Sequence, residues 1–300
     1  MNNRSDRRRR RDLARSARPT LEGLEGRQLL FATAGGQWSH PSRITFSFVP
    51  DGTSVGGTPS TLFQSMNADP NAPNWVAAIA NAAAVWQQVT GINLEPVPDN
   101  GAALGSGPDQ QGDPNHGDIR IAATPMGAGT LAMTFAPPPI NGGDLAGDIV
   151  FNTVEPWTTN GGTYDLETVA IHELGHALGM GHSAIASAVM YASYNGPKQA
   201  LTLDDTLGIQ SLYGPQPSDP YANLPLTAYN VTGQLNAQGQ LTQVMPGPQR
   251  TPLLNNGDWF YVQAPANTSG TLTVAMQATG FSLLQPDVAV LDGGLTKVLG

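Results

Sequence analysis

Apolar residues along this chain change their spacing from segment to segment, and the spacing predicts which segments are strands and which are helices. Within residues 43–49, Ile44, Phe46 and Phe48 alternate with polar positions, as in a strand with one buried face. Further strands are predicted at residues 92–97, 118–122, 130–135 and 148–151.

Helical spacing appears in three segments. In residues 74–90, apolar side chains recur every three or four positions, with Asn74 as the cap and Gly91 as the stop. A second apolar flank surrounds residues 168–178, where Gly175 and Ala177 allow close packing. Thr202 is expected to cap a third helix that runs to Tyr213, with Asp205 as its capping-box partner.

After Gly214 the pattern changes. PQPSDP reads as a linker, which we place at residues 215–228. Residues 229–300 hold short alternating runs split by Gly, Pro and Asn, which predict an antiparallel β-sandwich. No closing strand is evident before Gly300, so we expect this β-domain to be partial. Its DWFYVQAP core resembles the accessory domain that follows many secreted bacterial proteases, and a generic β-domain is the alternative.

Composition and charge narrow the class of protein. The 300 residues suffice for about two domains, and 40% hydrophobic with 12% charged residues suits a folded chain. Residues 1–27 hold nine of the 14 Lys and Arg and four of the 23 Asp and Glu, which leaves five basic against 19 acidic residues beyond them. Such an acidic body disfavours nucleic-acid binding and favours divalent cations. There is no cysteine, and therefore no disulfide.

The basic leader, residues 1–36, is expected to be largely disordered. It could be a solvated arm, a nucleic-acid tail or a targeting segment. Its longest apolar run, residues 29–32, is too short for a standard signal peptide. LEGLEGRQLL resembles a tag at the start of many large exported bacterial proteins, which favours export to the outside or the cell surface. No stretch reaches the roughly 18 apolar residues that would span a bilayer.

The candidate chemistry lies in AIHELGHALGMGHS, which fits HExxHxxGxxH. Residues i and i+4 share a helix face, so His172 and His176 can bind one ion, and Gly179 lets the chain turn back to bring in His182. Three protein ligands leave the fourth zinc position to water, as in catalytic sites. Glu173 is then the candidate general base. The alternative, an ordinary amphipathic helix, is disfavoured because three of the chain's five histidines fall in this frame.

These segments together resemble the matrixin family of metzincin metalloproteases. HELGHALGMGHS, AVMYASY and LDDTLGIQSLYG match the family's zinc motif, methionine turn and last helix. The resemblance implies an α+β catalytic domain over residues 37–214, with a twisted, mostly parallel five-stranded sheet and three helices. It also places Met190 as an apolar floor under the metal. Ala192 stands where matrixins usually have Pro, at the wall of the specificity pocket.

The same resemblance suggests calcium and argues against a second zinc. GDIVFNTVEPWT matches a calcium-binding stretch, with Asp148, Asn152 and Glu155 at ligand positions, and Asp118 matches a further one. The alternative is a set of turn-capping acids. Met133 and Val150 replace two histidines of the family's structural zinc site, and His116 is taken to be a surface loop residue. We therefore expect one catalytic zinc, with calcium as a further candidate.

The sequence thus predicts a secreted, zinc-dependent endopeptidase that acts on proteins or peptides, with a monomer as the default state. Glu173 would take a proton from zinc-activated water and pass it to the leaving amine. Two alternatives stay open: a binding or adhesion module that keeps the fold without turnover, and zinc hydrolysis of a non-peptide bond.

Overall fold

The computed structural model describes residues 31–160 and 162–216, and beyond them residues 228–234, 236, 259–263, 273–274, 289–292 and 294. The predicted protease body therefore lies almost entirely within the described residues. Most of the leader, the linker and the predicted β-sandwich lie outside them, and these predictions stay predictions.

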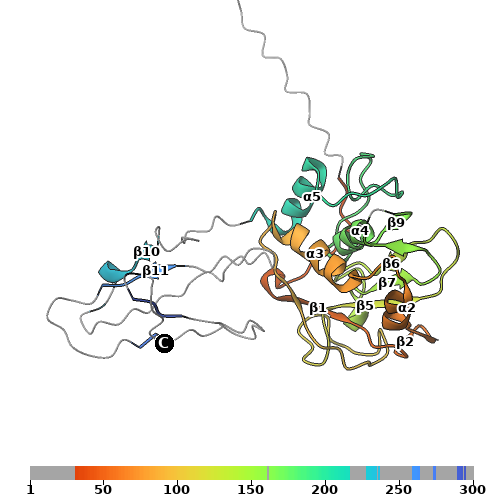
Figure 1. The fold of residues 1–300 in the computed structure, drawn as a ribbon, viewed down its shortest axis with the longest axis horizontal. Coiled ribbons are helices and arrows are strands. Elements are labelled where there is room, and N and C mark those ends of the chain that lie inside the picture. The colour runs from red at the N-terminus through yellow and green to blue at the C-terminus, as the bar shows by residue number, and fades with distance from the viewer. Residues whose placement is uncertain are drawn as a thin grey trace, which may run out of the picture.

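A five-stranded mixed sheet runs through the body (Figure 1), in the order β4-β1-β5-β7-β6. Its strands are β1 (Ile44–Phe48), β4 (Leu94–Pro96), β5 (Ile119–Thr124), β6 (Ala132–Thr134) and β7 (Ile149–Asn152). All neighbouring pairs are parallel except β6 with β7, which are antiparallel. The predicted five-stranded, mostly parallel sheet is confirmed, and β6 forms one of its edges.

Two helices cover one face of this sheet: α3 (Trp75–Gln87) and α4 (Leu166–Ala177). They share one core with Ile44, Phe46, Ile119 and Ile121, the alternating residues of β1 and β5. Trp86 on α3 donates from Nε1 to Ile171 O on α4, at 2.9 Å. A Cβ on Gly175 would collide with the Trp86 ring, so glycine there lets the two helices approach.

The opposite face of the sheet is covered by loops and carries polar side chains. Arg120 on β5 is fully buried there and pairs with Asp99 of the β4–β5 loop, with 2.8 Å between Nη2 and Oδ1. Val49, Ala122 and Val150 form a small second apolar cluster on this side. The sequence pattern of the strand predicted at residues 118–122 did not indicate that Arg120 would be buried.

The remaining helix of the predicted set is α5 (Leu203–Tyr213), and its capping box between Thr202 and Asp205 is confirmed. The sequence pattern did not predict the short helix α2 (Leu62–Ala68). It also did not predict two pairs of two-residue strands. These are β2 (Ser54–Val55) with β3 (Thr58–Pro59), and β8 (Trp157–Thr158) with β9 (Tyr164–Asp165). Short 3-10 turns lie at η1 (Pro41–Arg43), η2 (Gly143–Leu145) and η4 (Thr232–Gln234). Such short elements offer too few positions for a periodic pattern.

The backbone just before residue 37, the predicted start of the protease domain, contacts the body. Thr33 bridges Met180 in antiparallel fashion, and Ala34 N donates to Gly179 O at 2.7 Å. Residues 32–34 thus pair with the turn that follows α4, and the domain start at residue 37 stays a prediction.

The described pieces of the C-terminal segment include one strand pair, β10 (Tyr229–Asn230) with β11 (Phe260–Tyr261). This pair is parallel, whereas the sequence pattern predicts antiparallel neighbours. Among the helices that the structure describes, none has the length and apolar character needed to cross a membrane.

Candidate active site

Helix α4 presents the first two metal-ligand candidates. The Asp165 carboxylate caps its N-terminus by accepting from Thr168 N at 2.9 Å and from Thr168 Oγ1 at 2.6 Å. His172 and His176 follow on one face of the helix, one turn apart. Their rings lie edge to face, with centroids 4.6 Å apart.

The end of α4 brings in the third histidine. Gly179 has φ +99°, and Met180 N donates back to Gly175 O at 2.8 Å, as in a Schellman turn. A Cβ on Gly179 would also collide with Gly36 O. The predicted role of Gly179 is confirmed: the chain leaves the helix there and places His182 beside the other two imidazoles.

The three imidazoles converge through their Nε2 atoms. His176 Nε2 lies 3.1 Å from His172 Nε2 and 3.2 Å from His182 Nε2. Among the residues that the structure describes, this is the one group of three possible ligands whose atoms all lie within 4.8 Å of one another. Tetrahedral zinc with Zn–N bonds of about 2.0–2.1 Å separates its ligands by about 3.3–3.4 Å, so the spacing fits one zinc ion.

The other ring nitrogens fix the tautomers. His172 Nδ1 lies 2.8 Å from Val189 O, and His176 Nδ1 lies 2.8 Å from Met180 O. A carbonyl can only accept, so each Nδ1 carries the hydrogen and each Nε2 keeps a lone pair for a metal. Burial lowers the pKa of His172, and burial together with the neighbouring His172 lowers the pKa of His176 to about 4, so both rings are neutral near pH 7.

The methionine turn lies beneath the histidines and is tied to α5. Met190 is fully buried, and a Cβ on Gly175 would collide with its Sδ, which places it under the metal-ligand helix. The buried Asp205 carboxylate accepts from both Val189 N and Met190 N at 3.0 Å. Because Val189 O in turn accepts from His172, Asp205 indirectly orients the first ligand.

Glu173 lies in the same cleft and is only 7% exposed. Burial raises the pKa of its carboxyl, while His176 and a hydrogen bond from Thr134 oppose the rise. Thr134 Oγ1 on β6 donates to Glu173 Oε2 at 2.6 Å. Thr134 was not predicted from the sequence, because a threonine in a short strand gives no sign of which residue it faces.

The cleft around these residues has a volume of about 640 Å³. One wall is the edge strand β6 with the residues before it, and the opposite wall is the segment after Met190. Lys198 also lines the cleft, and its Nζ donates to Ala186 O and Ala188 O at 2.8 Å, which ties that wall together. The predicted wall over residues 191–195 is part of this lining.

The four predicted calcium residues do not gather at one point. Asp118 and Asp148 precede β5 and β7, whereas Asn152 ends β7 and Glu155 follows it. Asn152 Nδ2 donates to Gly127 O and Thr130 O, and its Oδ1 accepts from two backbone N–H groups. Its amide thus bonds the loop carbonyls directly. Asp148 differs, because its Oδ2 is buried without a hydrogen-bond partner.

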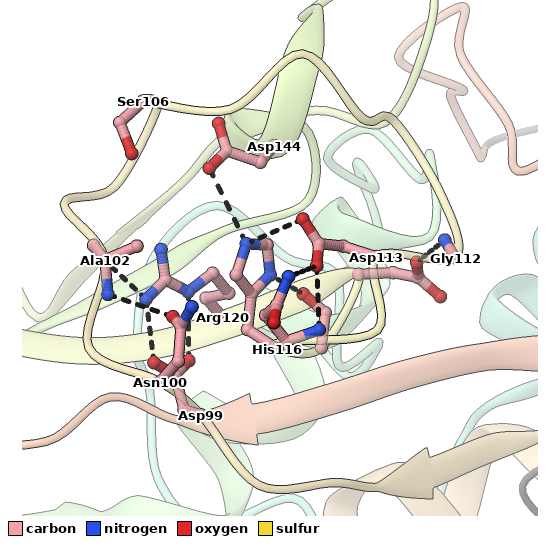
Figure 2. Close-up of polar contacts among 12 residues, drawn as sticks. Asp99, Asn100, Ala102, Ser106, Gly112, Asp113, His116, Arg120 and Asp144 are labelled. Atoms are coloured by element: carbon pink, nitrogen blue, oxygen red, sulfur yellow. Dashed lines mark hydrogen bonds and ion pairs between the residues drawn. The ribbon is translucent and has the colours of Figure 1, made fainter.

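The interpretation of His116 as a surface residue is wrong. It is 5% exposed, and its Nε2 lies near the carboxylates of Asp113 and Asp144 (Figure 2). The loop that carries it folds over the sheet, and this cannot be read from local sequence. Met133 and Val150 do face each other across β6 and β7, and neither side chain suits zinc.

A mixed sheet above a helix that carries HExxHxxGxxH is the architecture of the metzincin class of metalloproteases. Within this class, the family model described as Matrixin matches residues 61–214, just over half of the chain. The chain belongs to the matrixin family.

Curated relatives agree with this assignment. Karilysin of Tannerella forsythia is 47% identical over 102 residues, which cover 33% of this chain and 21% of karilysin. Matrix metalloproteinase-20 of Homo sapiens is 46% identical over 105 residues, covering 34% of this chain and 20% of the relative. The hatching enzyme of Paracentrotus lividus is 36% identical over 193 residues, which cover 62% of this chain and 28% of the relative. The chain thus spans less than a third of the length of each of these relatives.

Proposed function

We propose that this chain is a zinc-dependent endopeptidase that cleaves peptide bonds in proteins or peptides outside the cell that makes it. The observation that carries the proposal is the convergence of three imidazoles, with Nε2 separations of 3.1 and 3.2 Å from His176, beside the buried carboxylate of Glu173. Membership of the matrixin family and the similarity to a relative named matrix metalloproteinase-20 support the same reaction.

The histidines, Glu173 and Thr134 have separate roles in the proposed reaction. His172, His176 and His182 hold the ion, and zinc bound there supplies Lewis acidity and lowers the pKa of water. Glu173 accepts a proton from the attacking water and delivers it to the leaving amine nitrogen. Thr134 holds the Glu173 carboxylate in place while the proton moves.

Substrate binding follows from the edge of the sheet. β6 pairs with β7 on one side only, so its other edge can take an extended peptide as an added strand. A peptide in this position passes over Glu173 and the histidines, because β6 lines the same cleft. Cleavage within a chain, rather than at its end, fits a cleft of this kind.

Two observations support export: the leader resembles the tags of exported proteins, and the chain belongs to a family of peptidases.

Proteolysis is tested by incubating the purified protein with casein and gelatin, with and without a zinc chelator. New internal fragments that disappear with chelator and return with zinc are expected. Zinc-bound protein that cleaves neither substrate nor a random peptide library would favour a binding module, and hydrolysis of a non-peptide ester alone would favour the other alternative.

A further inference from the structure

One lysine lines the catalytic cleft. Among the described residues around this cleft, Lys198 is the one Lys or Arg, and Glu173 is the one Asp or Glu. The described part of the chain has two further Lys or Arg residues, and neither lines the cleft: Arg43 lies in η1, and Arg120 is buried with Asp99 on the other face of the sheet. Lys198 is thus the one ammonium of the cleft wall.

The backbone of Lys198 is held close to the zinc-ligand helix. Lys198 N donates to Thr168 Oγ1, in the first turn of α4, at 2.8 Å. Thr168 precedes His172 by four residues, so the two lie one helical turn, about 5.4 Å, apart on the same face of α4. Both line the cleft. The attachment point of Lys198 is therefore one turn along α4 from the first metal-ligand candidate.

The ammonium of Lys198 has neutral partners only. Its Nζ donates to Ala186 O and Ala188 O and lies 5.4 Å from the centroid of the Tyr191 ring. Two carbonyls use two of its three hydrogens, so one hydrogen is left for a further acceptor. Within the described part of the chain, no Asp or Glu forms an ion pair with Lys198. Burial lowers the pKa of Lys198, although Asp205 opposes the change, so its charge is incompletely compensated.

The surroundings of this ammonium are mostly apolar or aromatic. The cleft lining near it comes from α4, the methionine turn, the wall after Met190 and β6, and includes Val169, Val189, Tyr191, Tyr194 and Leu131. In a largely apolar cleft, a single well-placed polar group fixes which ligand side chain is accepted. An acidic side chain meets both conditions, because its methylene carbons can pack on apolar atoms while its carboxylate takes the remaining hydrogen of Nζ.

The geometry of an extended peptide places one of its side chains here. A peptide added to β6 has its scissile carbonyl beside the three histidines, and its residues advance by about 3.3–3.4 Å each. Successive side chains point to opposite faces. One residue within two positions of the scissile bond therefore directs its side chain toward the start of α4, where Lys198 is attached.

We propose that Lys198 makes this cleft select peptides that carry an acidic side chain, Asp or Glu, within two positions of the scissile bond. The ammonium donates its third hydrogen to the carboxylate of that side chain. Lys198 determines specificity here and takes no part in breaking the bond. This inference rests on the proposed peptidase activity and adds a class of substrate to it.

The test uses the zinc-loaded full chain and a peptide library blocked at both ends, so that only side chains carry carboxylates. Sequencing the cleavage products should show Asp or Glu enriched at one position within two residues of the cut. Two peptides that differ only by Glu or Gln at that position are then compared. We expect kcat/KM to be about tenfold to a hundredfold higher for the Glu peptide, the range for a hydrogen bond between charged groups.

Lys198→Met keeps an unbranched side chain and removes the charge, so the ratio of kcat/KM for Glu over Gln should fall to about one. Arg43→Met is the matched control, because it removes one positive charge outside the cleft, and it should keep the wild-type ratio. Circular dichroism and zinc content verify that each variant is folded.

Three outcomes would contradict the proposal in distinguishable ways. A wild type that cleaves peptides without a preference for acids overturns it, even if Lys198→Met does not fold. A preference that survives in folded Lys198→Met also overturns it. Zinc-loaded protein that cleaves no peptide in the library contradicts the proposed peptidase activity itself, and the specificity falls with it.

Discussion

Thr134 Oγ1, on the edge strand β6, donates a 2.6 Å hydrogen bond to Glu173 Oε2 on α4. The bond links the strand that would hold substrate to the carboxylate that would move the proton. A hydrogen bond to an ionised carboxylate is stronger than one between neutral groups. Thr134 is thus a positioning residue for the proposed general base.

The isosteric change Thr134→Val tests this role. Hydrogen bonds to charged groups contribute about 1.5–3 kcal/mol, so kcat should fall about tenfold to a hundredfold, with KM and Tm nearly unchanged. Steady-state kinetics on a cleaved peptide gives the two constants separately. Thr134→Ser keeps the hydroxyl and should restore kcat, so equal losses in both variants would contradict the assignment.

Substituting Glu173 and substituting His176 should have different effects on zinc binding and activity. Glu173→Ala leaves the three imidazoles in place, so zinc should stay bound while turnover falls by about 10² to 10⁴. His176→Ala removes the imidazole whose Nε2 lies within 3.2 Å of both other ligands, so catalytic zinc and activity should be lost together. Metal analysis beside activity measurements separates the two outcomes. Near-normal turnover by zinc-bound Glu173→Ala would exclude it as the base.

Sequence reasoning predicted the catalytic centre well because its determinants are local. The i, i+4 histidines, the glycine stop and the capping box of α5 each depend on residues only a few positions apart, and the structure confirms the geometry of each. The individual strands were predicted from local residue patterns, whereas the five-stranded, mostly parallel sheet was implied by the resemblance to matrixins.

What the sequence did not show depends on residues distant along the chain. Asp205 also holds the methionine turn, Thr134 meets Glu173 across 39 positions, and Arg120 pairs with Asp99 across a loop. His116 appeared exposed because its own neighbours are polar, yet η2 covers it from 28 residues away.

Calcium is proposed at the Asp148 end of β7 alone. The Asp148 side chain has one buried oxygen without a hydrogen-bond partner, and burial raises the pKa of its carboxyl well above the usual range. A cation bound there would lower this pKa again. Millimolar Ca²⁺ should raise Tm after full chelation, and Asp148→Asn should remove that response. Glu155→Gln, at the other end of the strand, should retain it. A Tm that is indifferent to calcium would support the alternative of turn-capping acids.

The buried pair of Asp99 and Arg120 should stabilise the fold in a pH-dependent way. Burial acts to raise the pKa of Asp99, but hydrogen bonds from Arg120, Ser47 and Gly101 outweigh it, and the pKa is lowered. A lowered folded-state pKa means that the pair's stabilisation is complete above the unfolded value of about 3.9 and is lost as pH falls through the folded value. Asp99→Asn leaves Arg120 buried without its counter-charge, so about 3–5 kcal/mol should be lost at pH 7.

Urea unfolding of the wild type and Asp99→Asn at several pH values between 7 and 3 measures this difference in the free energy of unfolding. The difference should be constant from pH 7 to about 5 and should shrink below the unfolded pKa of about 3.9. Asp148 has a raised pKa and acts in the opposite direction, with stability lost as pH rises, and most of that effect is common to both proteins because burial is the largest cause of the raised pKa. Asp109→Asn, exposed on the same loop, should match the wild type throughout. A difference that grows on acidification would show that Asp99 is not ionised in the folded protein.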